Sequence, residues 1–111
     1  MAVTDTQTVD GIAFGSSEGT LILEIYDHLD FEGKFEFDHI AILQDKLNAY
    51  IGFINSRQYE EVYPGKAFDR FIININFLNN VSENCRKYIS NANFKLRESN
   101  IQIAIQSENE A

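Results

Sequence analysis

The stretch of sequence that decides the fold is FDRFIININFL, residues 68–78. Its large apolar side chains alternate with positions that include Asn74 and Asn76. Alternation with a period of two is typical of a β-strand that buries one face. We therefore predict a central strand here, with an amide-bearing face turned away from the core.

The segment after this strand has a helical pattern and then a second alternating stretch. Asn80 can cap a helix with Glu83 as its capping-box partner. The apolar positions of that helix are Val81, Cys85, Tyr88, Ile89, Ala92 and Leu96. In residues 101–106 isoleucines alternate with Gln102, Ala104 and Gln106. A strand, a helix and a strand in succession predict a right-handed crossover between parallel strands. Because both strands carry amides on their second face, we expect helices on one face only.

Upstream of residue 68 the sequence predicts a hairpin and a long helix. Residues 9–14 and 20–26 read as strands joined by the turn cluster GSSEG. The apolar positions of the helix, which begins near Glu36 or Asp38, form one stripe. They are Ile40, Leu43, Leu47, Ile51 and Ile54, widened by Ile42, Ala49 and Phe53. Residues 58–63, before the turn Pro64-Gly65, are expected to form an optional edge strand.

These segments predict an α+β fold of two layers, a mixed β-sheet of four or five strands with two helices on one face. The expected order is β-β-α-(β)-β-α-β. We expect one domain over residues 1–111, with loose tails at 1–8 and 107–111.

The charge balance bears on the class of partner. The chain has 17 acidic and nine basic residues, which gives a formal net charge of -8. This balance disfavours nucleic acid and anionic membrane surfaces, whose binders need clustered Lys and Arg, but it suits a basic protein partner. The single cysteine allows no internal disulfide, and residues 1–10 lack the pattern of a signal peptide. We therefore expect a cytoplasmic protein.

Two Asp-His dipeptides are the main candidates for chemistry: Asp27-His28, close to Asp30, and Asp38-His39. Carboxylates and imidazoles bind divalent metals and act as acids and bases. If the first dipeptide ends a strand and the second begins a helix, the two can face each other. The alternative is that they cap or solvate the element ends. Because no HExxH or comparable spacing occurs, we assign no metal ligand, no cofactor and no catalytic residue.

Other motifs favour ordinary structural roles. Cys85 lies on an apolar helical stripe and is expected to be a buried thiol. The glycines of residues 11–19 form no phosphate-binding loop. The segment 59–63, YEEVY, is either a docking strand or a charged edge that prevents aggregation.

The predicted open sheet face is the leading candidate for binding. Besides Glu24 and Ala104, it carries the side chains that we assign as candidate interface residues: Ile22, Tyr26, Ile72, Asn74, Asn76, Gln102 and Gln106. A neutral, partly apolar face resembles the core of a protein interface. A solvated face that tolerates amides is the alternative.

Residues 21–105 resemble a family of small bacterial proteins known only as a domain of unknown function. The segments that carry the resemblance are DHLDF at 27–31, LQDKLNAY at 43–50 and SRQY at 56–59. The resemblance implies a bacterial, cytoplasmic setting and gives no residue a catalytic role. A connection with toxin-immunity neighbourhoods would suit an acidic binding module.

Three functions remain open. The first is a non-enzymatic protein-interaction module, either homodimeric through the open face or bound to another protein, for example as an immunity-type protein that binds a basic toxin. The second is a small metal-dependent or acid-base enzyme built on the Asp-His dipeptides. The third is a small-ligand binder with a pocket between helices and sheet. We favour the first, because the sequence holds no catalytic motif.

Overall fold

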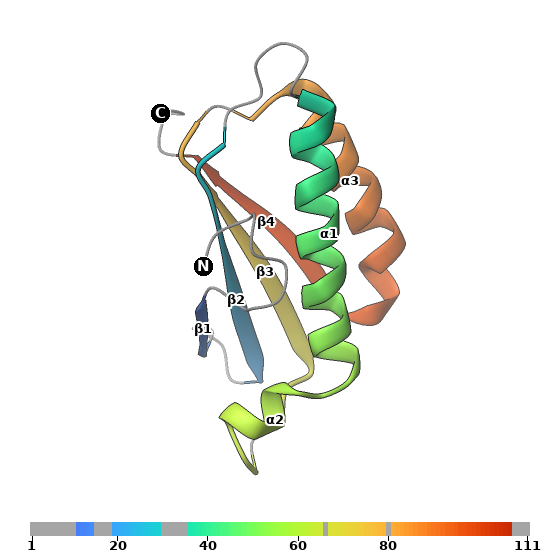
Figure 1. Cartoon of the computed structure of the whole chain (residues 1–111). Helices are drawn as coiled ribbons and strands as arrows, with labels where there is room; N and C mark the ends of the chain where they lie inside the picture. Colours follow the sequence, from blue (N-terminus) through green and yellow to red (C-terminus); the bar gives the residue numbers. More distant parts are fainter. Residues whose placement is uncertain (1–10, 15–18, 30–35, 66, 80, 108–111) are drawn as a thin grey trace.

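The described part of the chain alternates strands and helices. The computed structural model describes residues 11–14, 19–29, 36–65, 67–79 and 81–107. The elements are β1 (Gly11–Phe14), β2 (Thr20–Asp27), α1 (Glu36–Asn55), α2 (Tyr59–Val62), β3 (Arg70–Phe77), α3 (Glu83–Leu96), the 3-10 helix η2 (Arg97–Ser99) and β4 (Ile101–Ser107) (Figure 1). The predicted α+β class is confirmed.

The strands form one sheet in the order β1-β2-β3-β4. The β1 and β2 strands pair antiparallel, as the predicted hairpin requires, whereas β2, β3 and β4 are parallel. Each parallel connection passes through a helix, because parallel neighbours need a long crossover. The register sets Ile22 beside Ile72, and Ile72 beside Gln102. Residues of one face therefore line up across three strands.

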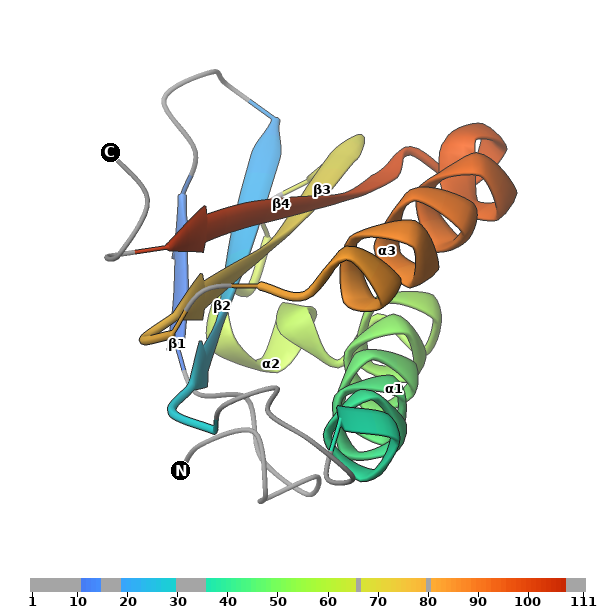
Figure 2. The ribbon, with the colours of Figure 1, turned by 90° about the horizontal axis from the view of Figure 1, so that it is seen from above.

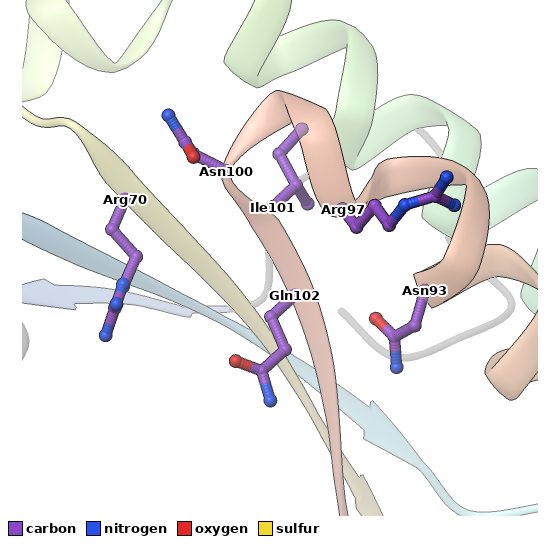
Figure 3. A pocket seen from close by; sticks show the side chains of 6 residues that line it. All are labelled: Arg70, Asn93, Arg97, Asn100, Ile101 and Gln102. Carbon is purple, nitrogen blue, oxygen red and sulfur yellow. The ribbon is translucent and has the colours of Figure 1, made fainter.

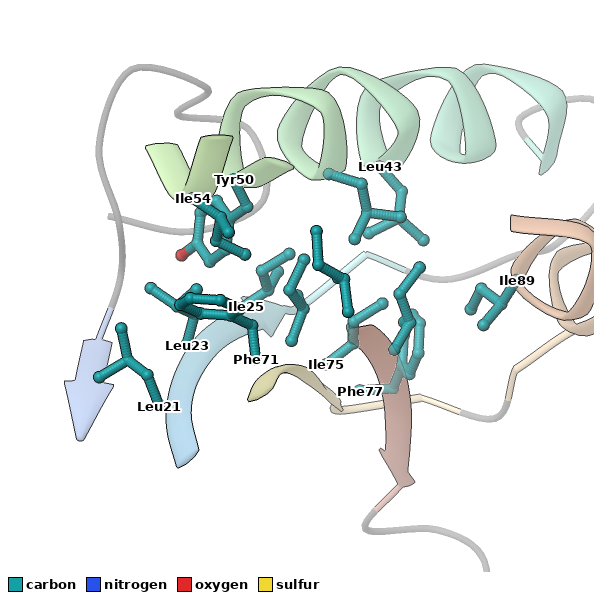
Figure 4. Packing of buried hydrophobic residues seen from close by; sticks show 14 of the residues in the cluster. Leu21, Leu23, Ile25, Leu43, Tyr50, Ile54, Phe71, Ile75, Phe77 and Ile89 are labelled. Atoms are coloured by element: carbon teal, nitrogen blue, oxygen red, sulfur yellow. The ribbon is translucent and has the colours of Figure 1, made fainter. Parts of the chain in front are cut away.

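The helices α1 and α3 lie on the same side of the sheet (Figure 2). Apolar side chains fill the space between the two layers, as Figure 4 shows for part of the cluster. Full burial of such a side chain contributes about 1.5–3 kcal/mol relative to exposure. The buried set is Leu21, Leu23, Ile25, Leu43, Leu47, Tyr50, Ile54, Tyr59, Phe71, Ile73, Ile75, Phe77, Val81, Cys85, Ile89, Ile101 and Ile103.

The buried side of α1 is rotated relative to the predicted apolar stripe. Ile40 is only half-buried and Ala49 is exposed. The buried residues of the helix are His39, Leu43, Lys46, Leu47, Tyr50 and Ile54. Specific contacts accommodate the polar side chains on this buried side of α1. For example, Tyr50 Oη donates a hydrogen bond to the carbonyl of Glu24 at 2.5 Å. Hydropathy spacing leaves such residues out because it counts only apolar side chains.

The predicted edge strand over 58–63 is wrong, because this segment contains the short helix α2. Arg57 adopts a positive φ of 64° and turns the chain after α1. The Tyr59 ring is then buried against Phe68 and Phe71, at centroid distances of 5.7 and 5.2 Å. This aromatic packing holds the segment against the end of the sheet where β3 begins. The packing outweighs the strand-like composition of the segment.

The predicted cap of α3 is also corrected. Ser82, in extended conformation, is the N-cap, and its Oγ accepts a hydrogen bond from the backbone N–H of Cys85 at 3.2 Å. Asn80, the predicted cap, lies outside the described residues. A hydroxyl at this position satisfies a backbone donor that the helix cannot pair internally.

Candidate functional site

Asp27 and His39 meet inside the fold. Asp27 ends β2, and His39 lies in the first turn of α1. His39 Nε2 lies 2.6 Å from Asp27 Oδ2. The backbone N–H of Leu29 donates to Asp27 Oδ1 at 3.0 Å, and that of Leu78 donates to the Asp27 carbonyl at 2.9 Å. The pair therefore ties the carboxyl end of β2 to α1 and to the end of β3.

The burial of this pair favours a structural role. The exposed fraction of the side chain is 2% for His39 and 0% for Asp27. The geometry allows a proton to be shared between imidazole and carboxylate, but a substrate in solution has no contact with either group. Buried polar groups of this kind stabilise a fold when each has a partner.

The other members of the predicted cluster do not join the pair. His28 and Asp38 are exposed, and Asp30 lies outside the described residues. Within the described ranges, no group of three or more His, Cys, Asp and Glu side chains could hold a metal ion. The contact between Asp27 and His39 therefore joins one residue of the first Asp-His dipeptide to one residue of the second.

Cys85 is a buried thiol at the start of α3. Burial, with the nearby negative charge of Asp27, raises the pKa of its thiol to about 12. A thiol with so high a pKa stays protonated near neutral pH, and the nucleophilic form is the thiolate. Its position therefore favours packing over catalysis.

The face of the sheet opposite α1 and α3 carries the amide-rich positions. We call this set the open face: Ile22, Glu24, Tyr26, Ile72, Asn74, Asn76, Gln102, Ala104 and Gln106. Gln102 and Gln106 are exposed, and Tyr26 is 49% exposed. Asn74, in the central strand, is only 9% exposed. The rim of this face is thus more accessible than its centre.

The carboxylate of the open face is held by two amides. Asn74 Nδ2 donates to Glu24 Oε2 at 2.9 Å, and Asn76 Nδ2 donates to the same oxygen at 2.6 Å. Asn76 Nδ2 also reaches the carbonyl of Ile25 at 3.3 Å. Hydrogen bonds to an ionised acceptor are stronger than neutral ones. The network joins β2 to β3 and leaves Glu24 less free to bind a cation.

The outer edge of β4 is covered in its middle by α3. Asn93 Nδ2 donates to the carbonyl of Ile103 at 3.0 Å, and its Oδ1 accepts from the Ile103 N–H at 2.7 Å. The side-chain amide thereby occupies two of the groups that an added strand would use. Covered edges are one way in which proteins prevent strand addition.

The comparison with known families gives one match. A family described as "Family of unknown function (DUF6572)" matches residues 1–109. The chain belongs to this family. The match confirms the resemblance to a family of unknown function and covers all the segments that carried it. No curated protein and no solved structure matches the chain. Among the helices that the structure describes in this DUF6572 chain, none is long and apolar enough to cross a membrane.

Sequence reasoning missed three side chains of this DUF6572 fold: Lys46, Tyr50 and Asn93. Lys46 is fully buried, with its Nζ 5.4 Å from the centroid of the Tyr50 ring. Both residues lie at helical spacing from Leu43, so a stripe that included polar residues would have found them. Asn93 gave no such signal, because its role depends on the neighbouring strand.

Proposed function

We propose that this chain is a non-enzymatic protein-interaction module that binds a second copy of itself through the open face. The observation that carries the proposal is the local neutrality of this face in a chain of net charge -8. Glu24 is its only carboxylate, and two amides bind it. Charge depletion is the compositional mark of interface cores.

The distribution of charge over the surface favours self-association over binding to a different protein. Two copies of a strongly acidic chain repel each other unless they meet through a neutral surface. The acidic residues Asp38, Asp45 and Glu60 are exposed on α1 and α2, away from the open face. A two-fold contact through the open face would keep these charges apart.

Amide side chains suit a symmetric contact. Each carries a donor and an acceptor, so a row of amides is complementary to a second copy of the same row. Gln102 and Gln106 are exposed. The exposed Tyr26 and the half-buried Ile72 add apolar surface. The covered middle of β4 disfavours the competing mode, in which two sheets would join edge to edge.

The acid-base alternative draws on the short distance between Asp27 and His39. Their burial weighs against it, because a catalytic group must reach its substrate. The same burial gives the pair a sufficient role in holding α1 to the sheet.

The test is size-exclusion chromatography with light scattering on the full chain, over a range of concentrations. We expect a mass twice that of the monomer. The double substitution Gln102→Glu and Gln106→Glu adds like charges to exposed positions of the face and should shift the equilibrium to monomer. The matched control is Gln44→Glu with Gln58→Glu, exposed positions outside the face that change the net charge equally. A monomeric wild type, or equal dissociation of both variants, would contradict the proposal.

A further inference from the structure

The outer surface of α3 carries basic side chains around one exposed aromatic ring. Cys85 and Ile89 turn toward the sheet and are buried. On the other side of the helix, exposed side chains recur every three or four residues, a spacing that keeps them on one face. We call this set the α3 face: Glu83, Arg86, Lys87, Ser90, Phe94 and Arg97. It belongs to the helix layer and shares no residue with the open face (Figure 2).

The charge of this helix is opposite to that of the rest of the chain. Residues 83–99 contain four of the nine basic residues and two of the 17 acidic ones, which gives this segment a formal charge of +2. The other five basic and 15 acidic residues give -10. Glu83 is the only carboxylate of the α3 face, and its Oε1 lies 3.8 Å from Lys87 Nζ with both side chains largely exposed. An exposed pair of this kind is weak, so the lysine remains available to a partner.

Phe94 supplies the apolar surface of the α3 face. Its ring is 66% exposed. The guanidinium carbon of Arg97 lies 3.9 Å from the ring centroid, and Arg97 Nη1 donates to the carbonyl of Phe94 at 2.7 Å. In Figure 3 the Arg97 side chain accordingly extends away from Arg70. The ring and the guanidinium therefore form a positioned pair in which an apolar surface lies beside a cation.

We propose that the α3 face binds an acidic segment of another protein, with an apolar side chain of that segment packed against Phe94. Carboxylates form charge-assisted hydrogen bonds with arginine and lysine. Aromatic and arginine side chains are the types that contribute most to binding at protein interfaces. Because the rest of the chain repels an acidic partner, the local positive charge determines where such a partner docks. This surface does not depend on the contact proposed for the open face.

Simpler roles explain only part of the α3 face. A cation near the C-terminal end of a helix interacts favourably with the helix dipole, which accounts for Arg97. Arg86 and Lys87 lie in the N-terminal half of α3, where the dipole gives no such benefit. Neither effect accounts for the exposure of Phe94. Nucleic acid is disfavoured as the partner, because its phosphates would meet the charge of -10 on the remainder of the chain.

The test is an NMR titration of the ¹⁵N-labelled full chain with three probes at matched ionic strength. They are a short glutamate peptide with one central leucine, a glutamate-only peptide of the same length and a thymidine oligonucleotide. We expect saturable shifts on the α3 face with the leucine-containing peptide, weaker binding of the glutamate-only peptide and a loss of affinity as salt rises. Equal affinity for the two peptides, or tighter binding of the oligonucleotide, would overturn the proposal.

The decisive variant is Phe94→Ala, which should weaken binding of the leucine-containing peptide by roughly ten-fold. The ring is exposed, so the fold should persist, as the amide spectrum of the variant will verify. Phe37→Ala is the matched control, because Phe37 is 72% exposed on α1 and lies outside the α3 face. This variant should bind as the wild type does. Equal affinity of Phe94→Ala and the wild type would contradict the assignment of Phe94.

A second pair of variants tests the contribution of charge. Lys87→Gln should weaken binding by about two- to five-fold, since it removes a cation from the α3 face. Arg57→Gln is its control: Arg57 is also exposed and also pairs with a glutamate, Glu60, at 2.8 Å, but it lies outside the face. Equal losses in both variants would show that the peptide responds to net charge alone and would overturn the proposed site.

Discussion

The side chain of Asn93 binds both peptide groups of Ile103, donating to its carbonyl at 3.0 Å and accepting from its N–H at 2.7 Å. A residue of α3 thus takes the place that a neighbouring strand would have beside β4. This contact fixes the last strand to the helix layer and covers part of the sheet edge.

Asn93→Ala should destabilise the fold and expose the β4 edge. The variant loses two hydrogen bonds, and we expect the free energy of unfolding to fall by about 1–3 kcal/mol. Urea denaturation measures this change, and static light scattering measures aggregation. The control is Asn91→Ala, an exposed amide on the same helix. An Asn93→Ala protein as stable and as soluble as the control would show that the contact has no such role.

Breaking the buried contact between Asp27 and His39 should destabilise the fold strongly. Removing one partner of a buried pair leaves the other uncompensated, so Asp27→Ala is expected to cost about 3 kcal/mol or more. Asp38→Ala removes an exposed carboxylate next to His39 in sequence and should cost less than about 1 kcal/mol. Denaturant unfolding compares the two variants. Similar losses in both would mean that the buried contact contributes little.

Cys85 should make stability fall at alkaline pH. Burial raises the pKa of its thiol in the folded chain from 9.0 to about 12. Because the folded state holds this proton more tightly than the unfolded state, the contribution is complete below pH 9 and is lost as the pH rises toward 12. The slope should approach about 1.4 kcal/mol per pH unit within this window.

The measurement is the free energy of unfolding as a function of pH for the wild type and for Cys85→Ala. The pKa of Tyr88 is also raised, first by burial and then by the charges of Cys85 and Asp45. The burial contribution is common to both proteins, so the difference between the two curves reports the Cys85 thiol together with its smaller effect on Tyr88. Parallel curves above pH 9 would be inconsistent with a buried, proton-retaining Cys85.

Much of the fold could be predicted because it depends on local periodicity. Ile73, Ile75 and Phe77 alternate with Asn74 and Asn76, and this pattern predicts which face of β3 is turned to the core. The segment that forms α2 could not be assigned in the same way. Its helix depends on the turn at Arg57 and on burial of the Tyr59 ring against β3, which are tertiary effects.

The same distinction between local sequence pattern and tertiary contact applies to the candidate sites. The sequence predicted a strand over residues 20–26 and a helix that begins near Glu36 or Asp38, so an approach of the two Asp-His dipeptides was one of two interpretations, and Asp27 and His39 do meet. It did not indicate that the pair would be buried. Phe94 falls outside the apolar stripe predicted for α3 and is exposed, but that pattern did not indicate that Arg97 would stack on its ring, a contact that depends on side-chain geometry at the end of the helix.

The most direct measurement of the central claim is an isotope-filtered NOE experiment on a mixture of ¹³C-labelled and unlabelled chains. If two copies associate through the open face, intermolecular NOEs should involve the methyl groups of Ile22, Ile72 and Ala104. The Ala49 methyl, exposed on α1, should give none. Intermolecular NOEs confined to α1, or no intermolecular NOE at concentrations where light scattering detects a dimer, would contradict the account.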